Sequence, residues 1–313
     1  TPDSRNVEQS RSIGMVSPKK PLVMVVAFLL GLILPISLIY LINLLNNKIE
    51  DKDEVDRKSN APVLGEISYV KKNVSPIVVR RGSRSIVAEQ FRVIRTSISF
   101  TKPGQSPRVI LVTSHRPEEG KSFTSINLAA SYALLNKKVV VLEFDLRKPR
   151  LSSTLDIHSD KGISNYLAGG VADIDTILQE IPDFEQRFWL LPAGPIPPNP
   201  AELILGDRMK LLMEELNKKF DYIIFDTPPY GLVTDSVLLG GYTDINIIVL
   251  RQGFTFKWVL SDINKRLMDN PAQPLYTVLN RVGEKSKYGS YKRYGYGYSE
   301  YFDVPDKKKK RAK

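Results

Sequence analysis

The chain has 313 residues, a net charge of +11 and no cysteine, and 42% of its residues are hydrophobic. That length allows one large domain with additional segments, or two domains. Without cysteine, disulfides and cysteine-based metal sites are excluded, and with only His115 and His158 a histidine-rich metal site is not expected. The positive charge favours polyanionic partners, either phosphates or an anionic membrane face, without choosing between them.

The first 42 residues contain a polar stub and an uncharged apolar segment. Residues 1–20 begin with Thr1 instead of Met, so we expect the stub of a longer protein. Residues 21–42 contain no charged side chain, and about 20 apolar residues are enough for a helix to cross a bilayer. We therefore predict a transmembrane helix at 21–42, with a buried core helix as the alternative. Basic residues flank the segment on both sides and leave its orientation open.

The middle of the chain alternates apolar strands with amphipathic helices. Residues 43–82 are charged and interrupted by proline and glycine, which suggests a juxtamembrane linker. The domain that follows, 83–285, has a pattern typical of an α/β fold, a parallel sheet with helices on both faces. Its expected strands are 108–114, 137–145, 187–194, 221–229, 245–253 and 275–282, and its clearest helices are 121–136 and 201–220.

A strand-to-helix junction at "VTSHRPEEGKSF" (112–123) ends in Gly120-Lys121-Ser122. Backbone N–H groups at such a turn can bind phosphate oxygens. Lys121 would then reach the β- and γ-phosphates, and the Ser122 hydroxyl would hold Mg²⁺. We expect Glu119, Gly120 and Phe123 to line the nucleotide as well. The first glycine of the usual pattern is absent, so an ordinary strand–turn–helix junction is the alternative.

Carboxylates follow two further strands. Asp226 ends the apolar strand of "YIIFDTPP", and Glu143 and Asp145 stand two residues apart at the end of "VVVLEFD". On a strand, residues two apart point to the same side. Each motif alone also fits an ordinary structural role, such as an Asp that caps a helix or a turn. Together they lie at the carboxyl ends of three strands, where α/β ligand sites form, and they predict an ATP–Mg²⁺ site. ATP places the part after residue 42 in the cytoplasm and Thr1 in the periplasm.

Residues 286–313 form a tail rich in tyrosine and lysine. Low apolar content with Gly and Ser spacers predicts disorder. The basic terminus 307–313 would either be solvated or touch anionic lipid. A tail used for aromatic stacking is the alternative to a tail of modified tyrosines. Within "YGSYKRYGYGYSEY" (288–301), six of fourteen residues are tyrosine: Tyr288, Tyr291, Tyr294, Tyr296, Tyr298 and Tyr301.

The motifs together resemble those of the bacterial tyrosine kinases (BY-kinases) of the polysaccharide co-polymerase type. The resemblance is carried by "SHRPEEGKS", "LEFDLRKPRL", "YIIFDTPP", "EQFRVIR", "LPAGPIPPNPAELI", "PVLGEI", the proline-flanked apolar segment and the tyrosine tail. It implies a P-loop NTPase-like fold, an inner-membrane location, and an autokinase that phosphorylates the tail tyrosines of a neighbouring copy in a ring.

The resemblance also implies roles for individual residues. Lys121 and Ser122 would bind phosphate and Mg²⁺, while Asp145 and Asp226 would hold Mg²⁺ and orient the attacking tyrosine. Ring contacts would come from three residues of "EQFRVIR", which spacing alone would assign to a solvated helix face: Glu89, Arg92 and Arg95. The implied partners are a phosphotyrosine phosphatase and components of polysaccharide polymerisation and export, with no nucleic acid.

Some positions depart from the family pattern or stay open. Glu143 stands where the family usually has Asp, which leaves its role as base or Mg²⁺ ligand in question. Arg116 would touch phosphate or be a solvated loop residue, and Asn280 would lie near adenine or cap a turn. Two other functions also fit the motifs: a membrane-tethered partition-type ATPase whose tail binds partners, and a co-polymerase scaffold whose nucleotide site gates assembly.

Overall fold

The computed structural model describes residues 20–71, 75–101 and 108–283. The stub at 1–19 and the whole tail from 284, including the six tyrosines and the basic terminus, lie outside the described residues. The chain forms two units, residues 1–47 and 48–313.

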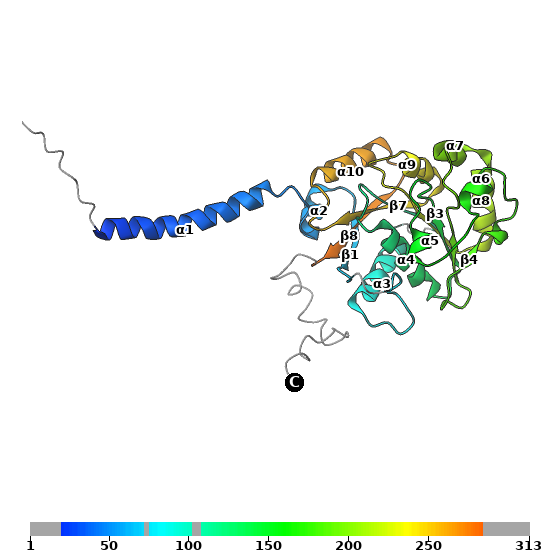
Figure 1. Cartoon of the computed structure of the whole chain (residues 1–313), viewed down its shortest axis with the longest axis horizontal. Coiled ribbons are helices and arrows are strands. Elements are labelled where there is room, and N and C mark those ends of the chain that lie inside the picture. The colour runs from blue at the N-terminus through cyan, green and yellow to red at the C-terminus, as the bar shows by residue number, and fades with distance from the viewer. Residues whose placement is uncertain (1–19, 72–74, 102–107, 284–313) are drawn as a thin grey trace, which may run out of the picture. The chain divides into compact units, whose positions relative to one another are not determined.

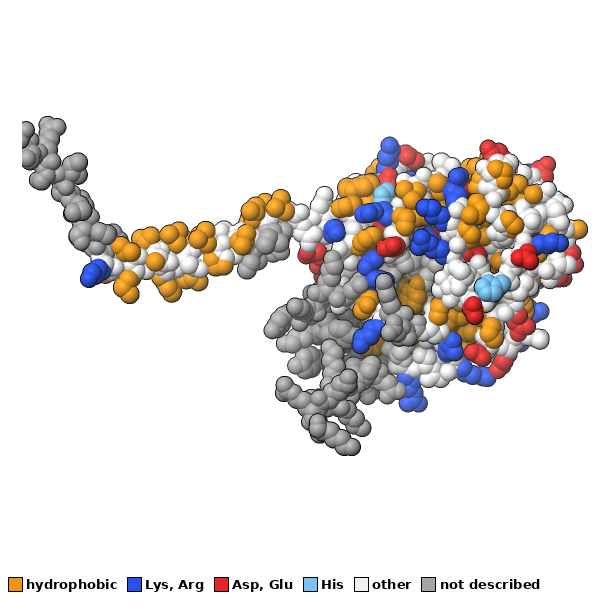
Figure 2. All heavy atoms as spheres, viewed as in Figure 1, with side chains coloured by type: hydrophobic (Ala, Val, Ile, Leu, Met, Phe, Trp, Pro, Cys, Tyr) orange, Lys and Arg blue, Asp and Glu red, His pale blue; other side chains and the backbone are white. Residues whose placement is uncertain are grey.

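The described part of the first unit contains one helix, α1 (Lys20–Leu45), of 26 residues with Pro35 inside it. Its apolar side chains are largely exposed, for example Met24 and Phe28, and Figure 2 shows hydrophobic side chains along the face in view. Among the helices of the described ranges, none qualifies by length and hydropathy as a membrane span. The transmembrane helix predicted at 21–42 is therefore not confirmed.

The second unit is built on an eight-stranded sheet (Figure 1). The strand order is β1-β8-β7-β2-β6-β3-β5-β4, and every neighbouring pair is parallel except β4 and β5. The parallel sheet of the predicted α/β class is thus confirmed. The strands are β1 (Val63–Ser68), β2 (Val109–Ser114), β3 (Val139–Glu143), β4 (Gln179–Glu180), β5 (Phe188–Leu191), β6 (Tyr222–Asp226), β7 (Ile245–Arg251) and β8 (Leu275–Val282).

Helices cover both faces of the sheet. Every residue of β2 is buried, with Ile110 and Val112 in one apolar core and Val109 and Leu111 in another. The first core contains α3 (Ile86–Ser99) and α4 (Lys121–Ala133), and the second contains α6 (Ile163–Leu167) and α8 (Asp207–Lys219). The other helices are α2 (Lys52–Lys58), α5 (Leu151–Thr154), α7 (Pro200–Leu205), α9 (Asp235–Leu239) and α10 (Trp258–Asp269), with short 3₁₀ turns at Ile174–Thr176 and Gly240–Tyr242.

The structure corrects the linker predicted at 43–82. The Asp51 side chain accepts a hydrogen bond from the Glu54 amide at 2.7 Å and begins α2, and β1 then pairs with β8. The buried residues of β1, Leu64 and Ile67, are three positions apart, so this strand lacks the two-residue alternation that identifies a strand in a sequence. The helix predicted at 201–220 is also divided, because Gly206 is extended (φ −71°, ψ 157°) and separates α7 from α8.

Candidate nucleotide-binding site

Gly120 lies at the junction of β2 and α4 in a conformation that favours glycine. Its φ is +103°, in the left-handed half of the map that a Cβ disfavours. A Cβ built there would lie 1.8 Å from the Asn280 side-chain nitrogen. That same nitrogen donates to the Glu119 carbonyl at 2.9 Å. The end of β8 therefore packs directly on the backbone of the turn, and the absence of a side chain at 120 is what makes this possible.

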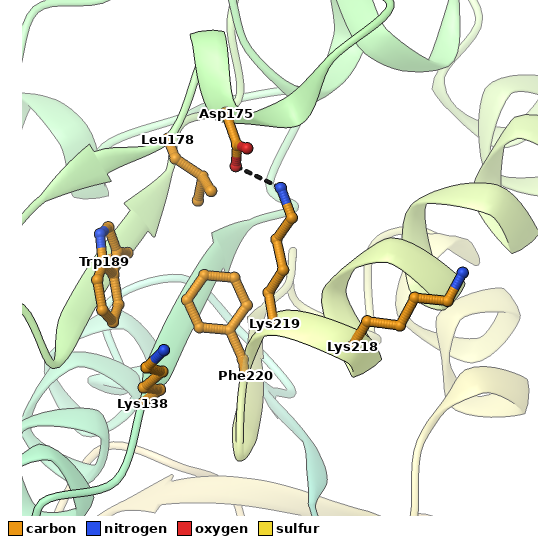
Figure 3. Close-up of a pocket in the computed structure, with 7 residues that line it drawn as sticks. All are labelled: Lys138, Asp175, Leu178, Trp189, Lys218, Lys219 and Phe220. Atoms are coloured by element: carbon orange, nitrogen blue, oxygen red, sulfur yellow. Dashed lines mark hydrogen bonds and ion pairs between the residues drawn. The ribbon is translucent and has the colours of Figure 1, made fainter.

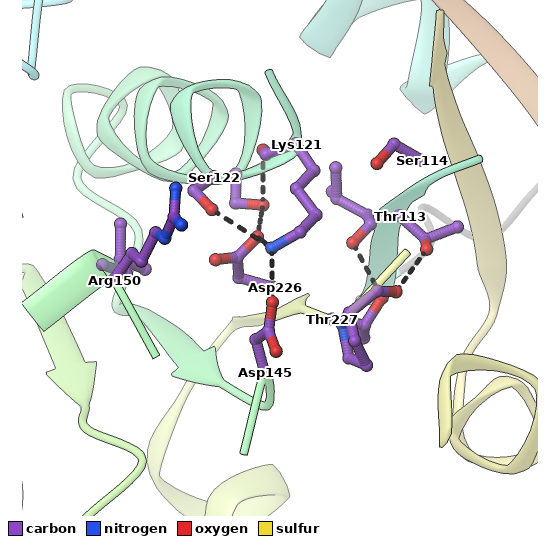
Figure 4. Close-up of polar contacts among 12 residues, drawn as sticks. Thr113, Ser114, Lys121, Ser122, Asp145, Arg150, Asp226 and Thr227 are labelled. Carbon is purple, nitrogen blue, oxygen red and sulfur yellow. Dashed lines mark hydrogen bonds and ion pairs between the residues drawn. The ribbon is translucent and has the colours of Figure 1, made fainter. Parts of the chain in front are cut away.

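Lys121 is the cation at the centre of the site (Figure 4). Its amine lies 3.0 Å from Asp145 Oδ2 and 3.9 Å from Asp226 Oδ1, and 3.5 Å from the Ser122 hydroxyl. Burial alone would lower the pKa of Lys121, but the two carboxylates outweigh burial and raise it. The lysine is thus held in its charged form.

Asp226 is almost completely buried, with 1% exposure, whereas Asp145 is 7% exposed. Burial raises its pKa, against the opposing effect of Lys121. The Ser125 hydroxyl lies 3.3 Å from its Oδ1. Just beyond it, the Thr227 hydroxyl donates to the Val112 carbonyl at 3.1 Å (Figure 4), which fixes the end of β6 against β2.

Glu143 lies close to this site, but its carboxylate accepts hydrogen bonds from backbone amides. One oxygen accepts from the amides of Leu151 at 2.5 Å and Ser152 at 3.2 Å, and the other from the amide of Ala193 at 3.2 Å. β3 ends at Glu143, so strand alternation does not extend to Asp145. The structure therefore separates the two carboxylates: Asp145 contacts Lys121, and the fully buried Glu143 joins the start of α5 to the loop after β5.

Two residues flanking the turn also have packing contacts. The Glu119 carboxylate accepts from the Arg116 amide at 2.8 Å and from the Thr255 hydroxyl, and burial raises its pKa. The Phe123 ring packs edge-on against Phe91 at 5.8 Å between centroids. Both residues stabilise the turn, and their side-chain contacts are to the protein interior.

The loop between β2 and Gly120 rests on aromatic rings. The Arg116 guanidinium lies 5.0 Å from the Phe254 ring centroid and 5.2 Å from that of Phe256. His115 packs edge-on against Trp258 at 4.8 Å and Tyr230 at 5.3 Å. Burial lowers the pKa of His115. These cation–π contacts hold the Arg116 guanidinium against the two rings, so Arg116 is not a fully solvated loop residue in this structure.

Three residues at the site were not identified from the sequence. Ser125 lies one helical turn after Lys121, so its i+4 spacing was an available signal. Arg147, two residues after Asp145, forms two hydrogen bonds with the fully buried Asp235, at 2.8 and 3.0 Å. Those partners are 88 residues apart, and no local pattern links them. Arg150, at the N-cap of α5, extends toward Ser122 in Figure 4.

The three residues of the predicted ring contact lie on α3 and contact their own subunit. Glu89 and Arg92 form an ion pair at 2.6 Å, and Arg92 also donates to the Ser83 carbonyl at 3.0 Å. Arg95 donates to the Ser131 carbonyl of α4, and burial lowers its pKa. Arg95 therefore fastens α3 to α4, the helix that begins at the phosphate turn.

The charge balance of the site fits a divalent cation. Two carboxylates, Asp145 and Asp226, lie within 4 Å of the single Lys121 amine in a buried setting, so the site has one more acidic side chain than it has ion-paired amines. No cluster of three or more His, Cys, Asp or Glu side chains suited to a metal occurs in the described part of the chain. Mg²⁺ commonly takes one or two carboxylates and completes its shell with phosphate oxygens and water. These two aspartates with Ser122 suit that arrangement.

A turn with a left-handed glycine, a buried lysine and two carboxylates at the carboxyl edge of a parallel sheet defines a P-loop-type nucleotide site. A family model described as "AAA domain" matches residues 107–256. The chain is 34% identical to the tyrosine-protein kinase YwqD of Bacillus subtilis over 217 residues, which cover 69% of this chain and 90% of that protein. It therefore belongs to the bacterial tyrosine-protein kinase family.

Two further comparisons extend this result. The chain is 30% identical to the tyrosine-protein kinase ptk of Acinetobacter johnsonii over 254 residues, 77% of this chain but only 34% of that protein. It thus spans about a third of that relative's length. The solved kinase domain of the Escherichia coli tyrosine kinase ETK is 25% identical, with a TM-score of 0.67, and the match covers 77% of this chain and 98% of that domain.

Proposed function

We propose that the chain is an ATP-dependent protein-tyrosine autokinase whose acceptors are the tyrosines of segment 288–301. The observation that carries the proposal is the position of the Lys121 amine beside both Asp145 and Asp226 at a glycine-ended turn. Family membership supports the choice of tyrosine as acceptor. A nucleotide-hydrolysing protein would need the same turn but not the tyrosine cluster.

The chemistry assigns a task to each residue. ATP supplies the phosphoryl group, and Mg²⁺ neutralises charge on its phosphates. The backbone of the turn and Lys121 bind the phosphates, and Ser122, Asp145 and Asp226 hold the metal. The tyrosine oxygen forms a bond to the γ-phosphorus while the bond to ADP breaks, and a carboxylate of the site accepts the hydroxyl proton. A phenol with an ordinary pKa near 10 needs such an acceptor at neutral pH.

The proposal includes the setting of the enzyme. α1 would attach the chain to the bacterial inner membrane with the stub outside, supported by its exposed apolar side chains. Copies would form a ring through α3, with Glu89 of the ion pair partly accessible. Control of capsular or exopolysaccharide polymerisation and export, and reversal by a phosphatase, rest on the resemblance of the motifs. Extraction by alkaline carbonate tests attachment, and sedimentation of Glu89→Ala tests the ring.

The direct test of the kinase is phosphotyrosine mapping after incubation of the full chain with Mg-ATP. We expect phosphate on tyrosines of 288–301 in the wild type and a loss of at least about a hundredfold in Lys121→Met, because the variant removes the buried charge that faces the phosphates. Lys210→Met is the matched control, since Lys210 is exposed on α8 and its amine lies 3.7 Å from Asp207. Active protein without phosphate on this segment would refute the proposal, and equal labelling of Lys121→Met would exclude this turn as the source.

A further inference from the structure

A hollow lies at the amino ends of the strands, opposite the nucleotide site at their carboxyl ends. It has a volume of about 400 Å³ and is lined by Lys138, Trp189, Lys218, Lys219, Phe220 and Asp175 (Figure 3). Lys138 immediately precedes β3, Phe220 lies just before β6, and Trp189 is in the first half of β5. These are the amino ends of the strands, whereas Lys121 follows the carboxyl end of β2. A ligand here would leave the nucleotide site open.

The walls of this hollow combine aromatic rings with positive charge. The Trp189 and Phe220 rings meet edge-on, 5.3 Å between centroids. The lining contains three lysines and one aspartate, a net charge of +2, and in Figure 3 the Lys218 amine points away from the other lining residues. Lys219 is paired with Asp175 at 2.5 Å. Among the described residues, no ion pair joins the amine of Lys138 or Lys218 to an acidic side chain, which leaves both amines available to an anion.

The chemistry of these walls suits a planar ring that carries a compact dianion. The volume is within the range of small-ligand sites, about 300–1,000 Å³. Aromatic walls accept a ring edge or face, and lysine ammonium groups bind phosphate as point charges. We propose that this hollow binds phosphotyrosine side chains of segment 288–301, so that it recognises the product of the reaction; this inference rests on the proposed function.

Charge explains why the modified segment would be selected. Unmodified, 288–301 has Lys292 and Arg293 against Glu300, one net positive charge, which the lysines of the hollow repel. Each phosphate adds about −1.5 to −2, so a single modification reverses the sign. The three lysines and two aromatic rings therefore form a phosphotyrosine-binding site, which is separate from the site of phosphoryl transfer.

The test uses a synthetic 288–301 peptide phosphorylated at Tyr294, which makes it independent of any kinase activity of the chain. Trp189 and Trp258 are the two tryptophans, so the full chain carrying Trp258→Phe reports on the hollow through Trp189 fluorescence. We expect the phosphopeptide to change this fluorescence with saturation. The double variant Lys138→Glu/Lys218→Glu should weaken the peptide's affinity by about tenfold or more, equivalent to about 1.4 kcal/mol.

The controls separate this site from general attraction of charge. Lys210→Glu makes the same charge change as either single substitution of the double variant, elsewhere on α8, and should leave binding unchanged. The milder pair Lys138→Gln/Lys218→Gln, with an unchanged melting temperature, should still weaken binding. Equal binding of the unphosphorylated peptide, an equal response to inorganic phosphate alone, or an equal loss in Lys210→Glu would each overturn the proposal.

A mixing experiment identifies which copy provides the segment. The phosphorylated Lys138→Glu/Lys218→Glu chain has a modified tail, but its altered hollow should not bind that tail. The Lys121→Met chain has an intact hollow and an unmodified tail. Association on mixing supports binding of a neighbour's tail, and its dependence on phosphate supports the proposal. If the peptide saturates the hollow in Lys121→Met but these chains do not associate, the segment comes from the same copy.

Discussion

Substitution of Gly120 by alanine tests whether the contact between the phosphate turn and β8 is as tight as the structure shows. The new Cβ would lie 1.8 Å from the Asn280 nitrogen, too close for two heavy atoms that are not bonded to each other. Asn280 is 3% exposed, so its amide has little room to withdraw. The turn, the asparagine or both must move.

The cost can be estimated from its parts. An L-residue in the left-handed region costs about 1–2 kcal/mol, and losing the bond from Asn280 to the Glu119 carbonyl costs about 1 kcal/mol or more, since the carbonyl is left buried. Gly120→Ala should therefore lower the free energy of unfolding by about 2–4 kcal/mol. For a domain of this size, that corresponds to a fall in melting temperature on the order of 10 °C.

A double-mutant cycle with Asn280→Ala separates the backbone cost from the collision. Chemical denaturation of the four proteins gives each free energy of unfolding. Because Asn280→Ala removes the group that the new Cβ strikes, its cost should be smaller in the Gly120→Ala background by about 1 kcal/mol or more. Purely additive costs, or a Gly120→Ala chain as stable as the wild type, would refute the reasoning.

Three further predictions concern the surroundings of the site. Glu143→Gln keeps one oxygen acceptor of two, so it should lower the free energy of unfolding by about 1–3 kcal/mol in urea denaturation; unchanged stability would show that the backbone bonds are dispensable. Arg147→Ala leaves the buried Asp235 without its cation and should cost about 3 kcal/mol, largely recovered in Arg147→Ala/Asp235→Ala; a double variant no more stable than Arg147→Ala would contradict this. Burial lowers the pKa of His115 below its usual 6.5, so the unfolded chain binds the proton more tightly and stability falls as pH drops below about 6.5. His115→Asn should flatten that part of a stability profile measured between about pH 5 and 8, and an unchanged slope would assign it to other groups.

The sequence predicted the core of the fold because parallel strands buried on both faces are nearly continuous apolar runs. All six expected strands are present, and the expected end of each strand places Lys121, Asp145 and Asp226 at one edge. The elements that the sequence did not predict depend on pairing between residues that are far apart in the chain. β1 has no two-residue alternation of buried side chains, so it is recognised from its pairing with β8.

At the site itself, the sequence did not predict the directions in which the side chains point. Glu143 and Asp145 were expected on one side of a strand, but β3 ends between them and the chain turns. The partners of Glu143 are the backbone amides of α5 and of a loop 50 residues away. The spacing of two carboxylates does not encode such partners, so the sequence raised the roles of base and Mg²⁺ ligand for Glu143 and did not indicate its backbone contacts.

The two edges of the sheet limit how copies of this protein can associate. An exposed edge strand offers unpaired amides and carbonyls to a strand of another chain. One edge here is β4, only two residues long and antiparallel. The other is β1, whose register shifts twice and whose Ser68 amide donates to the Gln90 side chain of α3 at 2.8 Å. Both edge strands, β4 and β1, are therefore poor templates for the addition of a strand from another chain. Association of copies by pairing of their edge strands is thus disfavoured, which favours contacts between copies through other surfaces.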